Sequence, residues 1–462
     1  MNDNEKKGWS FAIDRGGTFT DIIGFDPEGE LHSLKILSKS NKYSDPSIEG
    51  IRRIMDLSPD EIIPESDVTR IRMGTTVATN AILEKKGAPT CLAITEGFGD
   101  LLAIGNQARP DLFTLAIKKP LQIYDAVIEV KERINYQGKI IIPFNETSTK
   151  NQLELIRDKN ISSLAIVLMH AWKNKEHELR IAEIARSIGF NHVAISHEIM
   201  PIIKILGRGQ TTLIDAYLSP ILLDYISALK KETGGIPLEF MQSSGGLTNA
   251  ESFRGKDAVM SGPSGGVIAT AKISTLNGMT EAIGFDMGGT STDVSRFAGD
   301  YEKVEEATLG GISFQTPSLK INTVAAGGGS ILWFDGEKMR VGPESAGANP
   351  GPICYGLEGQ LALTDANLFL RRILPKYFPK TFGPHNDQFL NEQKTHDRFH
   401  EITEEINTSL GTSMSEEEVA LGFIRIANET MAAAIKEISV NKGFDIRTHV
   451  LVSFGGAAAQ HA

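Results

Sequence analysis

The chain has 462 residues, 41% of them hydrophobic and 23% charged, a composition typical of a soluble globular protein with about two or three domains. Its net charge of −11 and the lack of a long basic stripe exclude a protein that wraps nucleic acid. No apolar run approaches the ~20 residues that cross a bilayer, so we expect no association with a membrane.

The N-terminus and the cysteines indicate the compartment. Residues 1–7 are polar and lack the apolar core of a secretory signal, so the cytoplasm is the expected location. The sequence has two cysteines, Cys91 and Cys354, in unrelated contexts, which argues against a disulfide framework or a cysteine-bound zinc ion. We expect both to be buried.

The first part of the chain begins with strands. Residues 9–38 predict a three-stranded meander. A helix is predicted over 46–57, with apolar residues at helical spacing and Asp45 as its N-cap. After it, residues 72–80 lead from a strand into a helix that ends at Gly87.

Apolar strands then alternate with amphipathic helices, the pattern of an α/β fold. A long helix with one apolar face is predicted over 209–231. We place a domain boundary at its end, which gives a first domain of residues 1–230 and a second of residues 231–462. The clearest strand candidates are residues 90–95, 162–169, 192–195 and 238–241.

The second half is rich in glycine and ends in a strand and a glycine pair. A helix is predicted over 415–436, and a strand over 450–454 leads into Gly455 and Gly456. Because a glycine pair followed by small residues begins a helix beneath a nucleotide, and few residues follow here, we expect a truncated chain. The other segments of note are the glycine-rich residues 243–246, 261–266 and 325–330 and a polar stretch from about 375 to 412.

A repeated octapeptide, D-x-G-G-T-x-T-D, occurs as residues 14–21 and again as residues 286–293. Each copy lies between an apolar and a β-branched stretch and predicts a hairpin of strand, glycine turn and strand. Paired glycines let backbone N–H groups approach an anion, threonine hydroxyls add donors, and the aspartate can hold a hydrated divalent cation. Two such hairpins facing one another would grip a polyphosphate from both sides.

One copy alone is compatible with an ordinary hairpin whose glycines serve only the turn. However, a fold that needs two tight turns has no reason to repeat both carboxylates and both threonines. We therefore favour the interpretation that the pair binds phosphate.

Two such hairpins and a distant strand ending in Gly-Gly resemble the actin, sugar-kinase and heat-shock ATPase superfamily. The resemblance implies two related α/β domains of the ribonuclease H-like type, with ATP in a cleft between them and its adenosine near Gly455 and Gly456. The implied nucleotide contacts are Gly16, Gly17, Thr18 and Thr20 in the first hairpin, Gly288, Gly289, Thr290, Ser291 and Thr292 in the second, and Gly327 and Gly328.

The aspartates that open the two motifs, Asp14 and Asp286, are the implied catalytic and metal-binding residues. Each would hold a hydrated Mg²⁺ ion or orient the nucleophile. Which one does which is left open, as is any help from K⁺.

A closer resemblance is carried by residues 11–21, 72–81, 104–113, 261–267, 284–294, 321–330 and 341–348. These segments are similar to the hydantoinase A and 5-oxoprolinase family over essentially the whole chain. Arg15, where related hydantoinase and acetone carboxylase subunits usually have an apolar residue, favours the ATP-hydrolysing 5-oxoprolinases.

This resemblance implies ATP-driven opening of 5-oxo-L-proline to L-glutamate, a step of glutathione metabolism. A five-membered lactam is a poor electrophile, and phosphorylation of its oxygen would make the ring carbon attackable. The A-like half would transfer the phosphoryl group, and a hydantoinase B-like domain or subunit, the expected partner, would complete the hydrolysis. An oligomer is expected.

For the substrate we select Thr75, Thr76 and Asn80, together with Arg109 and Asp111, because a bidentate guanidinium suits a carboxylate ligand. The alternative is that Arg109 caps a helix or pairs with Asp111, and that the other three are helix caps and satisfied turn donors. Other functions also stay open: an ATP-dependent hydantoinase or acetone carboxylase subunit, a non-catalytic actin-like ATP-binding module, or an inactive fragment.

Overall fold

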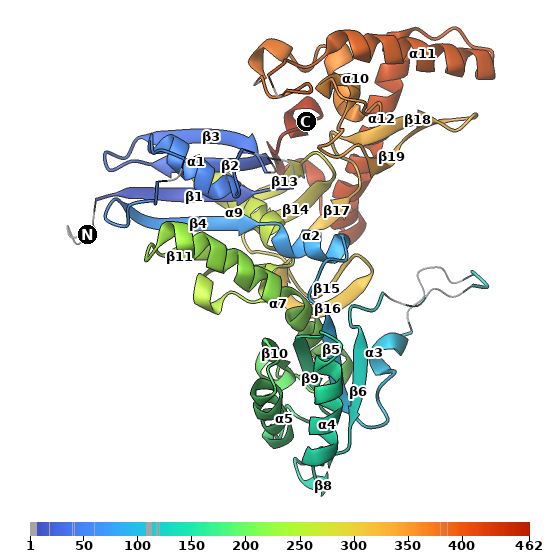
Figure 1. Ribbon diagram of the computed structural model, residues 1–462. Helices are drawn as coiled ribbons and strands as arrows, with labels where there is room; N and C mark the ends of the chain where they lie inside the picture. Colours follow the sequence, from blue (N-terminus) through green and yellow to red (C-terminus); the bar gives the residue numbers. More distant parts are fainter. Residues whose placement is uncertain are drawn as a thin grey trace. The chain divides into compact units, whose positions relative to one another are not determined.

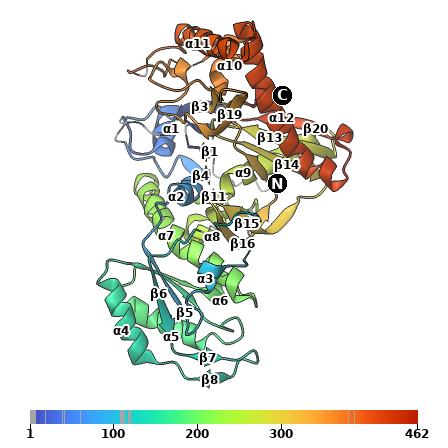
Figure 2. The ribbon, with the colours of Figure 1, turned by 90° about the vertical axis from the view of Figure 1, so that its right-hand side faces the viewer.

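The computed structural model describes residues 7–17, 19–38, 40, 42–59, 61–107, 113–116, 119, 121–378, 380–385 and 387–462. The chain forms two compact units, coloured along the sequence in Figures 1 and 2. Unit 1 comprises Met1–Ser264 and Lys303–Ser318, and unit 2 comprises Gly265–Glu302 and Leu319–Ala462. The division therefore falls after Ser264 and not after residue 230, because the strand pair that follows the long helix joins the first sheet.

Unit 1 contains a six-stranded sheet in the order β12-β11-β4-β1-β2-β3. Strands β1, β2 and β3 form the predicted antiparallel meander, and β4 lies parallel to β1 on its other side. The helix α1 (Pro46–Ile54) packs on β1, β2 and β3. The strands are β1 (Trp9–Arg15), β2 (Phe19–Phe25), β3 (Leu31–Leu37), β4 (Val68–Thr75), β11 (Leu238–Met241) and β12 (Leu247–Asn249).

A second sheet of unit 1 is fully parallel, in the order β10-β9-β5-β6. The helix α7 (Ile205–Thr233) packs on β9 and β10. The strands are β5 (Thr90–Thr95), β6 (Ala126–Val130), β9 (Ser163–Val167) and β10 (His192–Ile195), and β7 (Arg133–Ile134) and β8 (Ile140–Ile142) form a small hairpin. The remaining helices are α2 (Val77–Leu83), α3 (Leu101–Ile104), α4 (Glu146–Arg157), α5 (Glu176–Ser187), α6 (Ser196–Ile199) and α8 (Gly255–Ala258).

The helix α7 is long and apolar enough, by length and composition alone, to cross a membrane. Of its most apolar window, 61% is buried inside the protein, as in a core helix. Its buried face includes Leu213, Leu218 and Leu222, which belong to the largest hydrophobic cluster of unit 1.

The hairpin of β15 (Lys303–Leu309) and β16 (Ile312–Leu319) follows unit 2 strands in the sequence but belongs almost entirely to unit 1. Phe314 is fully buried in the core that contains α7. The hydroxyl of Thr211 on α7 donates to the Gln315 carbonyl at 2.8 Å and accepts from the Gln315 N–H at 2.9 Å. These contacts join sequence segments that no local pattern connects.

Unit 2 contains a four-stranded sheet in the order β17-β14-β13-β20. The part of α9 (Ser261–Leu276) that belongs to unit 2 covers one face of β13, where Gly284 lies against Thr270. Phe285 and Met287 on the other face join a core that includes α12 (Glu416–Ile438). The strands are β13 (Glu281–Met287), β14 (Thr292–Ala298), β17 (Asn322–Val324) and β20 (Val450–Phe454), with β18 (Ser330–Phe334) and β19 (Met339–Ser345) as a separate hairpin; the other helices are α10 (Leu363–Phe369) and α11 (Glu392–Leu410).

The two units repeat one topology. In each, three strands are antiparallel neighbours, as β1, β2 and β3 in unit 1 and β13, β14 and β17 in unit 2. In each, a fourth strand pairs in parallel with the first one, as β4 with β1 and β20 with β13. The duplicated octapeptide therefore reflects a duplicated sheet.

Most predicted elements are confirmed, and both cysteines are buried. Asp45 caps α1 by accepting from the N–H groups of Ser47 and Ile48. The helices that were not predicted include α9, which starts inside a glycine-rich segment, and α11, which lies in the polar stretch.

Candidate functional site

The first octapeptide forms a tight hairpin between β1 and β2. Its turn is closed by the N–H of Gly16, which donates to the Phe19 carbonyl at 3.1 Å. A Cβ at Gly16 would lie 2.8 Å from that carbonyl oxygen, so the position requires glycine. A Cβ at Gly17 would meet nothing within 4 Å, which leaves the backbone of Gly17 open to a ligand.

The second octapeptide has the same geometry between β13 and β14. The N–H of Gly288 donates to the Ser291 carbonyl at 3.0 Å, the equivalent of the bond made by Gly16. Gly289 and Thr290 are exposed at the tip of the turn. The similarity of the two motifs thus extends from the sequence to the hydrogen bond that closes each turn.

Each motif begins with an aspartate at the end of the first strand. Asp14 lies opposite Asp21 in the antiparallel register, and Asp286 lies opposite Asp293. Water reaches the Asp14 side chain. Its pKa is nevertheless raised above the ordinary value, first because the surrounding protein reduces its solvation and second because Asp21 is nearby, whereas Lys35 acts in the opposite direction.

Glycines lie beside both aspartates. In unit 1, a Cβ at Gly74 on β4 would lie 3.3 Å from Asp14 Oδ1. In unit 2, Gly455 has a positive φ of 91°, and a Cβ there would lie 2.4 Å from Asp286 Oδ1, too close for any side chain. Both carboxylates therefore lie against backbone that only glycine allows to come so near.

The third glycine-rich segment supports the second turn. The N–H groups of Gly328 and Gly329 donate to the Gly288 and Gly289 carbonyls at 3.0 and 2.6 Å. A Cβ at Gly327 would lie 2.6 Å from the backbone of Thr290 and Ser291, and one at Gly328 would lie 3.3 Å from the Cβ of Ala457. The structure thus brings together three segments of unit 2 that were assigned to the nucleotide.

The threonines before the last aspartate of each motif are not placed as ligand contacts, which corrects their assignment. Thr20 and Thr292 have no exposed surface. The Thr20 hydroxyl is hydrogen-bonded to that of Ser38, which donates to the Gly16 carbonyl, and the Thr292 hydroxyl donates to the Ala326 carbonyl at 2.5 Å. Strand alternation turns both side chains inward, where they hold the adjoining loops.

The substrate candidates described by the structure, Thr75, Thr76 and Asn80, lie where β4 enters α2. Thr75 is buried, and the Thr76 hydroxyl donates to the carbonyl of Arg15 at 3.1 Å. The Asn80 amide donates to the Thr76 hydroxyl at 3.3 Å. These polar groups are therefore linked to the first hairpin, as satisfied donors next to it. Thr18, Arg109 and Asp111 lie outside the described residues.

A hydrogen-bond network around His461 follows the glycine pair Gly455 and Gly456. The ring of His461 accepts from the Asn367 amide at Nε2, at 2.9 Å, and donates from Nδ1 to the Asn428 amide oxygen at 2.8 Å. Burial, with a smaller contribution from Arg372, lowers the pKa of His461 to about 4. The ring is therefore neutral at physiological pH, the state that both hydrogen bonds require.

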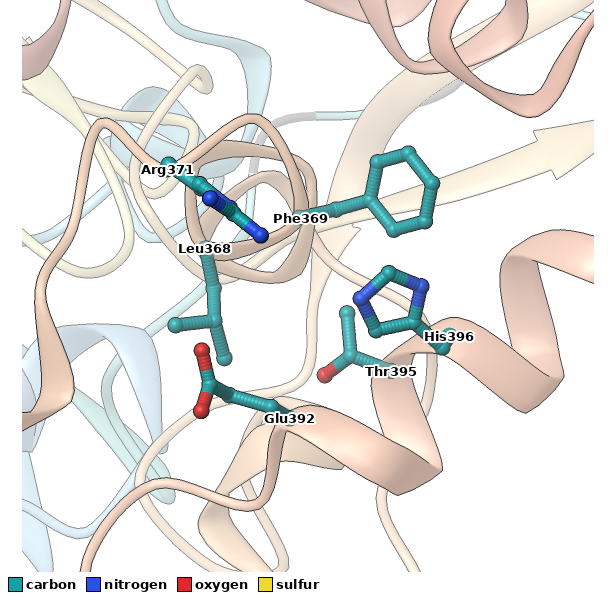
Figure 3. Close-up of a pocket in the computed structure, with 6 residues that line it drawn as sticks. All are labelled: Leu368, Phe369, Arg371, Glu392, Thr395 and His396. Atoms are coloured by element: carbon teal, nitrogen blue, oxygen red, sulfur yellow. The ribbon is translucent and has the colours of Figure 1, made fainter.

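A cavity of about 230 Å³ lies between α10 and the start of α11 in unit 2. It contains none of the predicted site residues. Figure 3 shows the rings of Phe369 and His396 beside one another at its edge, with centroids 4.6 Å apart. Its lining consists of Leu368, Phe369, Arg371, Glu392, Thr395 and His396.

Among the residues that the structure describes, no three His, Cys, Asp or Glu side chains form a cluster that could hold a metal ion. This fits magnesium bound through a nucleotide, because Mg²⁺ keeps several waters and uses one or two carboxylates plus phosphate oxygens. Asp14 and Asp286, each beside a phosphate-type turn, are suitable carboxylates.

Comparison with known proteins identifies a family and a fold. The family described as hydantoinase/oxoprolinase matches residues 208–462, and its N-terminal region matches residues 10–189. The 5-oxoprolinase 1 of Arabidopsis thaliana is 44% identical over 98% of this chain, and the chain spans 39% of that relative's length.

Two solved structures have a similar α/β fold. The ATP-dependent caprolactamase of Pseudomonas jessenii is 30% identical with a TM-score of 0.77, and the match covers 98% of this chain and 66% of that one. A nucleotide-free acetone carboxylase, described as acting by ATP-dependent acetone carboxylation, has a TM-score of 0.79 at 22% identity with the same coverage, which shows the fold alone.

Proposed function

The chain belongs to the hydantoinase/oxoprolinase family, and from this premise we propose that it supplies the ATP-dependent phosphoryl-transfer part of an enzyme that opens 5-oxo-L-proline to L-glutamate. The main support is the duplicated hairpin, whose two turns are closed by equivalent hydrogen bonds at Gly16 and Gly288. The 44% identical relative named 5-oxoprolinase supports the choice of substrate.

The hairpins suit a triphosphate because the backbone at the tips of their turns is exposed and can approach the phosphate oxygens. The exposed Gly17 offers its backbone without a side chain in the way, and Gly289 and Thr290 are exposed in the second turn. Phosphoryl transfer needs mostly positioning and charge neutralisation, which backbone N–H groups and one magnesium ion supply. In this proposal, the two hairpins belong to an actin-like ATPase fold and hold one nucleotide.

The carboxylates and the polar groups beside them have separate tasks in this proposal. Asp14 and Asp286 hold hydrated magnesium or orient the attacking oxygen. Gly74 and Gly455 allow close approach to those carboxylates. Thr76 donates to the Arg15 carbonyl of the first hairpin, and Asn80 donates to Thr76. In this proposal, these two residues position the lactam relative to the phosphate groups.

The partner and location follow from the same premise. The chain spans 39% of the length of the Arabidopsis relative. We propose that a hydantoinase B-like domain or subunit completes the hydrolysis, that the assembly is oligomeric, and that it works in the cytoplasm with magnesium as the cation.

The test is substrate-stimulated release of ADP by this chain together with its B-like partner. We expect 5-oxo-L-proline to stimulate release at least about tenfold over ATP alone, with glutamate as product, while hydantoin, caprolactam and acetone stimulate it little. Stimulation by hydantoin or acetone and not by 5-oxo-L-proline would show that the proposed substrate is wrong and that the stimulating compound takes its place. Tight ATP binding without stimulation by any of the four would favour a non-catalytic nucleotide-binding module.

A further inference from the structure

The guanidinium of Arg15 lies beside Tyr225 and Asp45. Arg15 is the last residue of β1 and directly precedes Gly16. Its guanidinium carbon lies 4.6 Å from the ring centre of Tyr225 on α7. The nearest carboxylate oxygen, Asp45 Oδ2, is 3.7 Å from Nη1, beyond hydrogen-bond distance.

Two buried hydroxyls near Arg15 also lack partners. Ser47, in the first turn of α1, is 1% exposed, and its Oγ makes no hydrogen bond within the described part of the chain. The hydroxyl of Tyr225 is buried and likewise unpaired. An unmade hydrogen bond at a buried hydroxyl costs roughly 1–3 kcal/mol, so two of them beside a cation indicate a missing acceptor.

The phenol of Tyr225 is available as a hydrogen-bond donor at this place. Burial raises the pKa of Tyr225 to about 12, Asp45 adds to the rise, and Arg15 and Ser47 oppose it. The phenol therefore stays protonated and can donate. The Asp45 carboxylate is committed elsewhere, since its Oδ1 accepts from the N–H groups of Ser47 and Ile48 at 2.8 and 3.2 Å. The N-terminal end of α1 contributes a further partial positive charge.

We propose that Arg15, Ser47 and Tyr225 bind the carboxylate of the substrate and so select a lactam that carries an acid group. This inference rests on the proposed function and adds a specificity determinant to it. A planar guanidinium binds a carboxylate with two parallel hydrogen bonds, and the two hydroxyls supply donors to its remaining lone pairs. Because Arg15 adjoins Gly16, the same short segment orients both the acid group and the phosphate turn.

The experiment compares two ligands that differ only in the acid group. The full 462-residue chain is titrated calorimetrically with 5-oxo-L-proline and with pyrrolidin-2-one, the same ring without the carboxylate. In the unaltered chain we expect 5-oxo-L-proline to bind at least tenfold more tightly. Arg15→Met should weaken the binding of 5-oxo-L-proline by about 10- to 100-fold, the range for loss of hydrogen bonds to a charged group. The affinity for pyrrolidin-2-one should stay within about twofold of that of the unaltered chain.

Conservative variants separate binding from folding. Tyr225→Phe and Ser47→Ala remove single hydroxyls. Each should weaken the binding of 5-oxo-L-proline several-fold and leave the temperature of thermal unfolding unchanged. Arg15→Lys should restore part of the affinity lost in Arg15→Met, because it keeps the charge but not the planar fork. Arg53→Met is the matched control: Arg53 is an exposed residue on α1 that pairs with Glu49, so both affinities should stay unchanged.

A titration with Mg·ATP in the same samples keeps the two proposals apart. Equal affinity of the unaltered chain for both ring ligands, or an equal loss of both in Arg15→Met, would overturn the carboxylate site while leaving ATP binding as evidence for the proposed function. Failure of the chain and its partner to bind Mg·ATP would overturn the proposed function itself.

Discussion

Burial decides the role of individual polar residues in the duplicated motif. Two threonines of one motif copy differ in exposure: Thr290 is exposed at the turn, whereas Thr292 is buried and bonded to the Ala326 carbonyl. The sequence pattern presents both as equal donors. Only the strand register, which places Met287 opposite Thr292, shows that the latter faces the interior.

His461 gives a residue-scale prediction about pH. Its pKa falls from 6.5 to about 4 on folding, so the folded state binds the proton less tightly than the unfolded one. The contribution of the neutral ring to the free energy of unfolding is complete above pH 6.5 and is lost as the pH falls through about 4. The loss lowers the free energy of unfolding by up to roughly 3 kcal/mol. The temperature of thermal unfolding should therefore fall less steeply between pH 7 and pH 4 in His461→Gln than in the unaltered chain.

The matched control for this pH series is His385→Gln, which alters an exposed histidine of unit 2. His385→Gln should leave the pH dependence of the unfolding temperature unchanged. If His461→Gln showed the same pH dependence as the unaltered chain, the neutral ring between Asn367 and Asn428 would not be the source of acid sensitivity.

At the scale of elements, packing between helices overrode local composition in several places. The start of α9 contains Gly262, Pro263 and Gly265, which favour a loop by local propensity, yet the segment is helical, and its part in unit 2 packs on β20 and β13, where Gly266 lies against Phe454 and Asp286. Proline is tolerated there because first-turn N–H groups have no partner within the helix. The polar helix α11 is held by its buried Phe399, Ile402 and Ile406.

The junction of α2 and α7 gives an element-scale prediction. A Cβ at Gly87 would lie 2.0 Å from Cζ of Tyr217, inside its ring. Tyr217 is 7% exposed in the core of unit 1 and cannot move freely. We expect Gly87→Ala to destabilise the chain by about 1–3 kcal/mol, measured by denaturant unfolding.

A double variant tests the cause. If the loss comes from overpacking, Tyr217→Ala should abolish most of the further cost of Gly87→Ala, so that the two effects are strongly non-additive. Additive losses would mean that Gly87 acts through its own backbone conformation and not through contact with Tyr217.

At the scale of the whole molecule, one topology occurs twice, and each copy carries a phosphate-type turn and an aspartate. In unit 1 the parallel strand β4 leads to Thr75 and Thr76, and in unit 2 the parallel strand β20 leads to Gly455 and Gly456. The equivalent positions thus carry polar side chains in one unit and bare backbone in the other.

The proposed binding of ATP gives a prediction for one glycine in each unit. Gly17 and Gly456 have room for a side chain and no positive φ, so valine at either position should fold normally yet obstruct a bound nucleotide. Calorimetry should show that Gly17→Val and Gly456→Val each weaken the binding of Mg·ATP by about tenfold or more.

The control for these two variants is Ser33→Val, which adds the same side chain at an exposed position of β3. It should leave affinity and stoichiometry unchanged. An unchanged affinity for Mg·ATP in either glycine variant would contradict the assignment of that glycine to the nucleotide.

The sequence by itself determined the family, the α/β class, the two hairpins and most element boundaries, because glycine pairs, caps and apolar periodicity act within a few residues of one another. The tertiary structure decided what depends on contacts between distant segments. It assigned Lys303–Ser318 to unit 1 through Phe314 and Gln315, turned Thr20 and Thr292 inward, and placed Arg15 beside Ser47 and Tyr225. These outcomes follow from packing and burial, which no local sequence pattern encodes.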